Sequence, residues 1–235
     1  MAVAFGAIGI ATTPSAANSP VSVPYPSGIV AGDPLLLAAV NGDPTGFTTP
    51  TGWTLAKGNS SVINDTGGAV YTKIADGTES GSLSVTKSGT NNMCMACMVR
   101  YTNYSGSPIG DSEIAVTAST ASTSSPARTA LSPVPGANDM VARFFLWAED
   151  ANGTGRSFTP PGSGWNTRMN ALTNVSSGTL FNCGIVMQDK VNGTDNQTCT
   201  CSATGGWIVI DVAIAAAPII QPLTNRARFI RASSW

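Results

Sequence analysis

The sequence predicts an all-β protein, a duplicated antiparallel β-sandwich with halves of jelly-roll or immunoglobulin-like size, and three observations lead to this class. Charged residues make up 11% of the 235 residues, against about 25% in an average soluble chain, and helical surfaces account for much of that usual charge. Turn signals rich in Gly, Pro, Asp and Asn recur about every 8 to 12 residues, a spacing typical of sandwiches. No stretch of about 11 residues or more shows helical periodicity.

The first half contains seven apolar or alternating runs, each ended by a turn signal such as Asp-Gly at 76–77. We expect strands at 3–11, 21–25, 35–40, 53–57, 69–74, 83–86 and 93–101. Within 82–87, serine and threonine alternate with larger side chains, which indicates a strand with one wet face. In the second half, residues 139–147 are almost continuously apolar, which predicts a central strand covered on both faces.

Matching landmarks indicate that the chain is a duplication. Three pairs share one offset of 106 positions: Ile8 with Ile114, Pro20 with Pro126, and Asp33 with Asp139. After small insertions, later landmarks also correspond: Phe47 with Phe158, Trp53 with Trp165, and residues 75–78 with 191–194. We therefore divide the chain into a first repeat at 1–105, a second repeat at 106–216, and an extended C-terminal arm at 217–235. Two sandwiches in tandem, or two halves packed as one pseudo-symmetric unit, both remain open.

Charge and composition favour few functional classes. A net charge of −1 gives no electrostatic footprint for nucleic acid or an anionic membrane. The chain has no His, the commonest general base and metal ligand. No apolar stretch approaches the length of a membrane span, and residues 1–10 are expected to form a first strand in preference to a signal peptide. We expect no enzyme activity, no cofactor, and no binding to nucleic acid or membrane.

The five cysteines have three possible roles: buried thiols, disulfides or a zinc site. Cys94 and Cys97 form a C-x-x-C motif, Cys199 and Cys201 form a C-x-C motif, and Cys183 stands alone. The C-x-x-C spacing suggests zinc, but residues three apart on a strand point to opposite faces and no turn lies between the two cysteines. We therefore expect buried free thiols and no metal.

Acidic residues occur mainly in expected loops. They are Asp33, Asp43, Asp65, Asp76, Asp139, Asp189 and Asp195. Calcium is one possible ligand of such loops, but the alternating carboxylates of a calcium loop are missing, so we expect Asx turns. Glu149 and Asp150 are adjacent carboxylates at the end of a strand, and adjacency alone does not make a glycosidase pair.

Two groups of residues are candidates for binding. Trp53, Trp165, Phe47 and Phe158 follow or flank Pro/Gly turns, where exposed rings could contact a glycan, although a Trp at such a position is more often part of a core. The C-terminal arm is too apolar for an ordinary solvated tail. We expect its apolar and basic side chains to contact other subunits: Ile219, Ile220, Leu223, Arg226, Arg228, Phe229, Ile230, Arg231 and Trp235.

Three motifs carry a resemblance to a known family. They are Pro26-x-Gly28-x-x-x-Gly32-Asp33, Thr49-Pro50-Thr51-Gly52-Trp53-Thr54-Leu55, and Tyr71-x-x-x-Ala75-Asp76-Gly77-Thr78-Glu79. Together they resemble the repeated β-sandwich proteins encoded among the structural genes of tailed bacteriophages, the minor tail and head-decoration proteins. The resemblance covers residues 3–104 best and residues 112–214 more weakly. Asn138 stands where the first half has Gly32, and residues 165–167 depart from the tryptophan motif.

The resemblance implies a virion structural protein that binds capsid or tail subunits. It implies assembly in the host cytoplasm, homo-oligomers within the particle, and no catalytic residues. A carbohydrate-binding adhesin module, with a glycan on the host surface as its partner, is the alternative from another functional class.

Overall fold

The computed structural model describes residues 1–11, 20–42, 46–59, 66–87, 94–104, 114–127, 131–132, 134–149, 153–162, 164–173 and 182–217. Within these ranges the chain forms strands and turns and no helix. The strands are β1 (Ala4–Ala11), β2 (Val21–Pro24), β3 (Pro34–Asn41), β4 (Thr54–Asn59), β5 (Gly67–Ile74), β6 (Ser82–Val85), β7 (Cys94–Thr102), β8 (Ile114–Ser124), β9 (Met140–Ala148), β10 (Phe158–Thr159), β11 (Asn166–Leu172), β12 (Cys183–Val191) and β13 (Thr200–Ile214).

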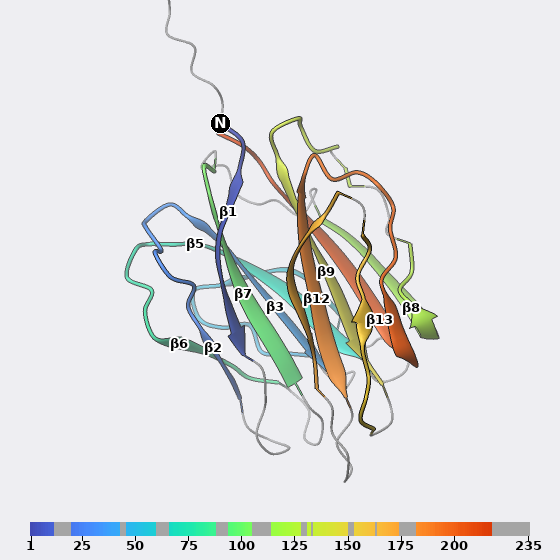
Figure 1. Cartoon of the computed structure of the whole chain (residues 1–235). Coiled ribbons are helices and arrows are strands. Elements are labelled where there is room, and N and C mark those ends of the chain that lie inside the picture. The colour runs from blue at the N-terminus through green and yellow to red at the C-terminus, as the bar shows by residue number, and fades with distance from the viewer. Residues whose placement is uncertain are drawn as a thin grey trace, which may run out of the picture.

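Two large antiparallel sheets contain most of these strands (Figure 1). The first sheet has the order β1-β7-β3-β5-β4. In the second sheet β13, β9, β12 and β11 follow one another, and β8 and β10 both pair with β13. Strands β2 and β6 form a small separate sheet. The prediction of an all-β antiparallel sandwich is confirmed.

The inner faces of the two large sheets share one hydrophobic core. Even-numbered residues of β3, such as Leu36 and Ala38, meet even-numbered residues of β9, such as Phe144 and Leu146. Gly68 lies where a β-carbon would be 2.8 Å from Leu146 Cδ1 and 3.0 Å from Ile208 Cδ1, so its lack of a side chain lets the opposite sheet approach closely. The two large sheets thus pack face to face around one core to which both contribute.

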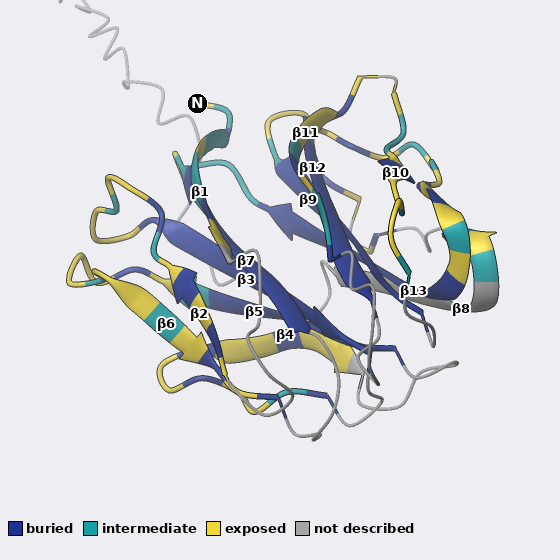
Figure 2. Ribbon diagram, turned by 60° about the horizontal axis from the view of Figure 1, so that its bottom comes forward, coloured by how far each residue is buried: buried dark blue, intermediate teal, exposed yellow. Residues whose placement is uncertain are grey.

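Both sheets are also covered on their outer faces, as Figure 2 shows for the strands at their centres. Odd-numbered residues of β3, including Leu35 and Leu37, pack with Val21, Val23 and Val85 of the β2–β6 pair. On the second sheet, Trp147 and Trp207 pack around Phe158. Strand β9 is buried along its whole length, as its apolar sequence predicts.

Equivalent strands of the two halves have matching order and register. Ile8 pairs with Val99 as Ile114 pairs with Val212, and the β3–β5 register matches the β9–β12 register. Strands β4 and β11 each contain a bulge at an equivalent place, after the pair Leu55–Tyr71 in β4 and after the pair Thr167–Gln188 in β11. The predicted match of residues 75–78 with 191–194 is wrong by one position, because Ile74, and not Ala75, is equivalent to Val191. An origin by duplication remains a proposal, which these registers support.

Candidate functional site

A row of polar side chains crosses the outer face of the second sheet. Thr167, Gln188, Arg143 and Asp211 are successive cross-strand partners on β11, β12, β9 and β13. Arg143 and Asp211 are completely buried and form a bidentate ion pair, with Nε donating to Oδ1 and Nη2 to Oδ2, both at 2.8 Å. We call these four residues the polar row.

The equivalent positions of the first sheet are apolar apart from one hydroxyl. Leu55, Tyr71, Leu37 and Met98 are likewise successive cross-strand partners. Trp53 and Trp165 precede the equivalent edge strands β4 and β11, and both are buried. The same architecture therefore encloses an apolar core in one half and an ion pair in the other.

Trp165 and the loop around Asp195 cover the polar row. The Trp165 ring stacks 4.2 Å from the Arg143 guanidinium carbon, and its Nε1 donates to Asp195 Oδ2 at 3.0 Å. Asp195 Oδ1 accepts from Lys190 Nζ at 2.9 Å. Burial raises the pKa of Asp195, but hydrogen bonds from Lys190 and Trp165 outweigh this effect and lower it.

Two buried atoms of the polar row lack hydrogen-bond partners: Arg143 Nη1, a donor, and Gln188 Oε1, an acceptor. The Gln188 amide nitrogen donates to Pro161 O and Thr167 Oγ1, each at 2.9 Å. The row contains no nucleophile beside a base, because Asp211 is held in the ion pair and Thr167 is hydrogen-bonded to an amide. Its arrangement is that of a structural ion pair.

Asp189 forms a second buried polar contact, which joins the two sheets. It lies on β12 and accepts hydrogen bonds from Arg168 Nε at 2.9 Å and from Tyr101 Oη of the first sheet at 3.4 Å. The prediction that Asp189 makes an Asx turn in a loop is wrong, because the residue lies within a strand. For Asp76 the prediction holds, since its Oδ1 accepts from the Thr78 backbone at 2.8 Å.

Asp33 and Asp139 stabilise equivalent turns before β3 and β9. Each accepts a hydrogen bond from the backbone N–H three residues earlier, at 3.0 Å from Val30 and 2.7 Å from Gly136. Arg100 also pairs with Asp33 at 2.7 Å. Both carboxylates therefore act as turn residues, as predicted, and Asp43 and Asp65 lie outside the described residues.

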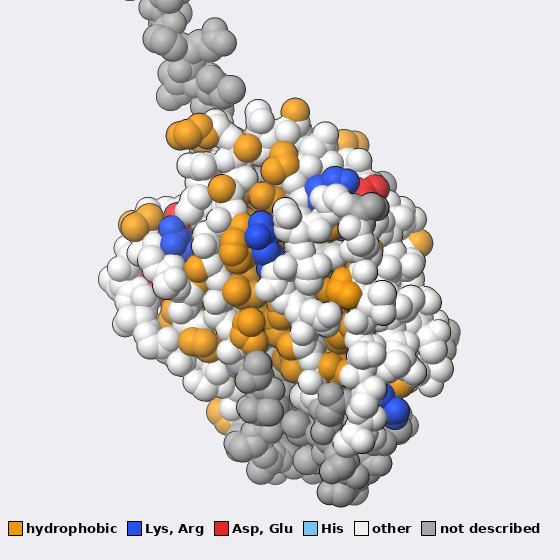
Figure 3. Space-filling model, in the orientation of Figure 1, with side chains coloured by type: hydrophobic (Ala, Val, Ile, Leu, Met, Phe, Trp, Pro, Cys, Tyr) orange, Lys and Arg blue, Asp and Glu red, His pale blue; other side chains and the backbone are white. Residues whose placement is uncertain are grey.

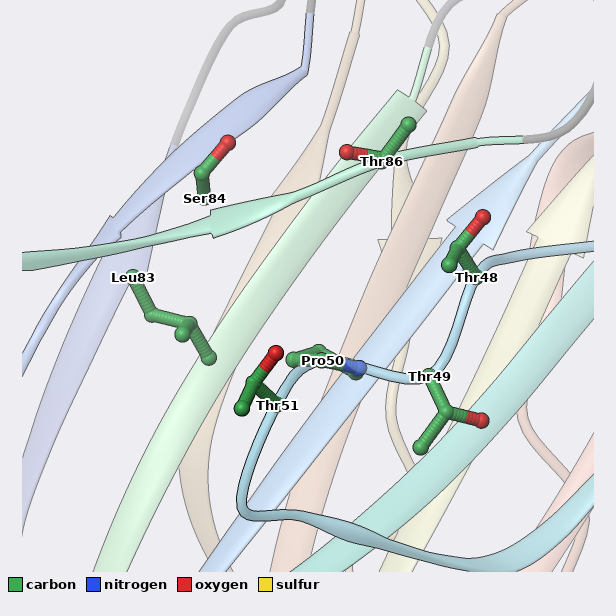
Figure 4. A pocket seen from close by; sticks show the side chains of 7 residues that line it. All are labelled: Thr48, Thr49, Pro50, Thr51, Leu83, Ser84 and Thr86. Atoms are coloured by element: carbon green, nitrogen blue, oxygen red, sulfur yellow. The ribbon is translucent and has the colours of Figure 1, made fainter.

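A shallow pocket of about 320 Å³ lies on the outer side of the first half (Figure 4). One wall is the 48–51 segment. The other consists of Leu83 and Ser84 of β6 together with Thr86, which lies directly after the strand. The lining consists of five hydroxyl side chains and two apolar ones: Thr48, Thr49, Thr51, Ser84, Thr86, Pro50 and Leu83. No charged residue is among them.

The pocket exists because pairing between these segments stops at Pro50. The Thr48 N–H donates to Thr86 O at 2.9 Å, and continuing this register would bring Pro50 opposite Ser84 at the next hydrogen-bonded pair. Pro50 has no N–H, and its carbonyl accepts from Trp53 in the tight turn that follows. The segment therefore turns away from β6 and opens the space between them.

The backbone of Ser84 points toward this pocket. Gly81 O accepts from Tyr25 N, so residues 81, 83 and 85 direct their backbone groups toward β2. Alternation then directs the N–H and C=O of Ser84 to the opposite side, the side of the 48–51 segment. One backbone donor and one acceptor thus join the hydroxyl groups at the pocket wall.

The four aromatic residues proposed to contact glycan are not open platforms. Trp53 and Trp165 are 7% exposed, Phe158 is 8% exposed, and Phe47 is half-buried against the outer core of the first sheet. Their rings pack against neighbouring side chains, so stacking on a sugar would require them to leave these contacts. Trp53 and Phe47 do flank the segment that forms one wall of the pocket.

All five cysteines are unpaired and buried. Cys94 belongs to the outer core of the first sheet and Cys97 to the shared core, so they point to opposite faces as predicted. Burial raises the pKa of Cys97, Cys183 and Cys199 to about 12. In the part of the chain that the structure describes, no three side chains of the metal-binding types gather at one point.

The remaining predicted candidates include Glu149, which is held in structural contacts. It accepts from Arg156 Nε at 3.0 Å and from Asn182 Nδ2 at 2.6 Å, and its neighbour Asp150 lies outside the described residues. The binding residues proposed for the C-terminal arm, from Ile219 to Trp235, also lie outside them. The described residues include no helix that could cross a membrane.

No protein-family model, curated protein or solved structure matches the chain in the comparisons.

Proposed function

We propose that this chain is a structural protein of a tailed-bacteriophage particle, decorating the capsid or forming a minor part of the tail. The observation that carries the proposal is the structural role of the three motifs that resemble those of tailed-bacteriophage proteins. Gly28, Gly32, Gly52 and Gly77 all have positive φ in tight turns, and Asp33 holds the turn before β3. These motifs build a scaffold and place no reactive group.

The described surface also suits such a role. Figure 3 shows a face with few charged side chains, on which hydrophobic side chains gather toward the middle among uncharged side chains and backbone. The ionisable residues described above are mainly tied into ion pairs within the fold. A doubly covered sandwich with no reactive constellation among its described residues fits a subunit that works by binding neighbours.

The C-terminal arm is the proposed anchor to other virion subunits. Its apolar side chains could be buried against a neighbour, and Arg226, Arg228 and Arg231 could pair with acidic groups there. Homo-oligomers, and assembly in the host cytoplasm, belong to the same proposal.

Mass spectrometry of purified virions tests the function. The expected result is this chain in the particle at a fixed ratio to the major capsid or tail proteins, and its absence from the particle would overturn the proposal. Removing residues 218–235 tests the anchor. The truncated protein should keep its thermal midpoint but disappear from virions, whereas normal occupancy would show that the arm is not the anchor.

A carbohydrate-binding module is the second candidate, and the hydroxyl-lined pocket of the first half is the observation that favours it.

A further inference from the structure

We propose that the pocket between β6 and the 48–51 segment binds a neutral saccharide. This site is independent of the virion proposal, because it uses the described surface of the first half and not the arm. The site is also distinct from the aromatic residues that the sequence singles out, since none of their rings lines it.

The chemistry of the lining selects the ligand. Hydroxyl groups of Ser and Thr both donate and accept hydrogen bonds, as sugar hydroxyls do. Thr48, Thr49 and Thr51 are exposed on one wall, and Ser84 and Thr86 are exposed on the other. The backbone N–H and C=O of Ser84 add a donor and an acceptor fixed by the strand, which costs less ordering than mobile side chains.

Charge and shape narrow the class further. No charged side chain lines the pocket, so nothing in it would pair with a phosphate, a sulfate or an ionised peptide side chain. Leu83 and Pro50 supply an apolar surface, against which the C–H face of a sugar ring could lie. A volume of about 320 Å³ is near the lower end for ligand pockets and suits a short saccharide.

The corresponding segment of the second half is held differently. Its equivalent segment carries two consecutive prolines, Pro160 and Pro161. Gln188, on the neighbouring strand β12, donates to Pro161 O at 2.9 Å and holds the segment against the sheet. The equivalent of Gln188 in the first half is Tyr71, whose hydroxyl donates to Phe47 O at 3.5 Å and is also hydrogen-bonded to the Thr49 side chain, so this contact differs from the one that Gln188 makes.

Amide chemical shifts of the ¹⁵N-labelled full chain test the proposal. Glucose, galactose, mannose, N-acetylglucosamine and N-acetylgalactosamine, as methyl glycosides, would each be titrated to about 10 mM, where a millimolar Kd is visible. At least one should shift the backbone amide signals of Thr48, Thr49 and Thr51 and of residues 83–86. No shift with any of the five, or shifts confined to other residues, would overturn the proposal. A response only to an extended Ser/Thr peptide would do the same and would indicate strand addition to β6.

Matched variants locate the contact. The double variant Ser84→Ala/Thr86→Ala should bind the responding saccharide about tenfold more weakly, through two lost hydrogen bonds. The control Ser22→Ala/Ser82→Ala removes exposed hydroxyls from the same small sheet but outside the pocket, and should bind within about twofold of the parent. If the first variant loses its dispersed spectrum, Thr48→Ala/Thr51→Ala on the opposite wall replaces it. Unchanged affinity in the folded pocket variant would overturn the proposal.

Discussion

Single residues on the second sheet decide how its outer core is stabilised. Arg143 and Asp211 occupy the positions that Leu37 and Met98 occupy on the first sheet, and both members of the ion pair are fully buried. Taking two charges out of water costs several kcal/mol per ion, which their attraction offsets only when both are present. The polar row is therefore sensitive to the loss of one partner and tolerant of the replacement of both.

A double-mutant cycle tests this balance. Arg143→Leu leaves Asp211 buried without its cation and should lower the free energy of unfolding by about 3–5 kcal/mol. Arg143→Leu/Asp211→Met, which installs the residues of the first sheet, should recover most of that loss. Urea denaturation of the parent, both single variants and the double variant measures the coupling. A double variant less stable than either single variant would show that the outer core of the second half cannot accept the apolar solution.

Because its thiols are buried, the protein should have a free energy of unfolding that depends on pH in the alkaline range. Burial raises the pKa of Cys97 and Cys183 to about 12 from an ordinary value near 9.0. A thiol whose pKa is raised on folding contributes stability that is complete below the unfolded value and is lost as the pH rises through the folded value. Under reducing conditions the free energy of unfolding should thus fall progressively from about pH 9 toward pH 12.

Cys97→Ala provides the comparison for this pH dependence. With one titrating thiol fewer, its stability should fall less steeply than the parent's above pH 9, by about 1.4 kcal/mol per pH unit. Parallel stability–pH profiles for the two proteins would contradict the assignment of the effect to the buried thiol.

Native protein should also react with a thiol reagent at pH 8 far more slowly than unfolded protein.

At the scale of elements, turn chemistry sets where strands begin and end. The predicted strand 35–40 is β3 (Pro34–Asn41), and the predicted strand 83–86 is β6 (Ser82–Val85), because Gly, Pro and Asp around them interrupt pairing. The polar row could not be predicted in the same way. Arg143 and Asp211 are charged residues within apolar runs, which is a signal, but their pairing depends on a register between strands 68 positions apart.

The pocket was also beyond prediction from sequence. It depends on the register that would bring Pro50 opposite Ser84, and that register follows from the bridge between Phe47 and Lys87 on distant segments. For Trp53 and Trp165 the sequence favours burial over an exposed platform, because a Trp after a turn is more often part of a core. Both side chains are buried in the structure.

Contact between β1 and β2 requires a glycine. A β-carbon at Gly9 would overlap the carbonyl oxygen of Pro24, a backbone atom that cannot rotate away. Gly9→Ala should therefore lower the free energy of unfolding by about 1–3 kcal/mol through overpacking. Gly162→Ala is the matched control, since no atom lies within 4 Å of the added carbon, and thermal denaturation of both variants gives the comparison. Equal midpoints for the two would contradict the close approach of β1 and β2.

At the scale of the whole molecule, the two halves depend on each other. The shared core takes Leu36, Val40 and Val99 from the first sheet and Phe144, Ile185 and Ile210 from the second. Separating the sheets would expose both inner faces to water at about 25 cal/mol per Å² of apolar surface. Tyr101, which reaches Asp189 across the interface, would also lose its partner. The halves should therefore unfold together, despite their repeated topology.

Differential scanning calorimetry of the full chain tests this central claim most directly. One shared core predicts a single transition whose calorimetric enthalpy equals its van't Hoff enthalpy. Two resolved transitions, or a calorimetric enthalpy about twice the van't Hoff value, would show two halves that unfold independently and would contradict the shared core.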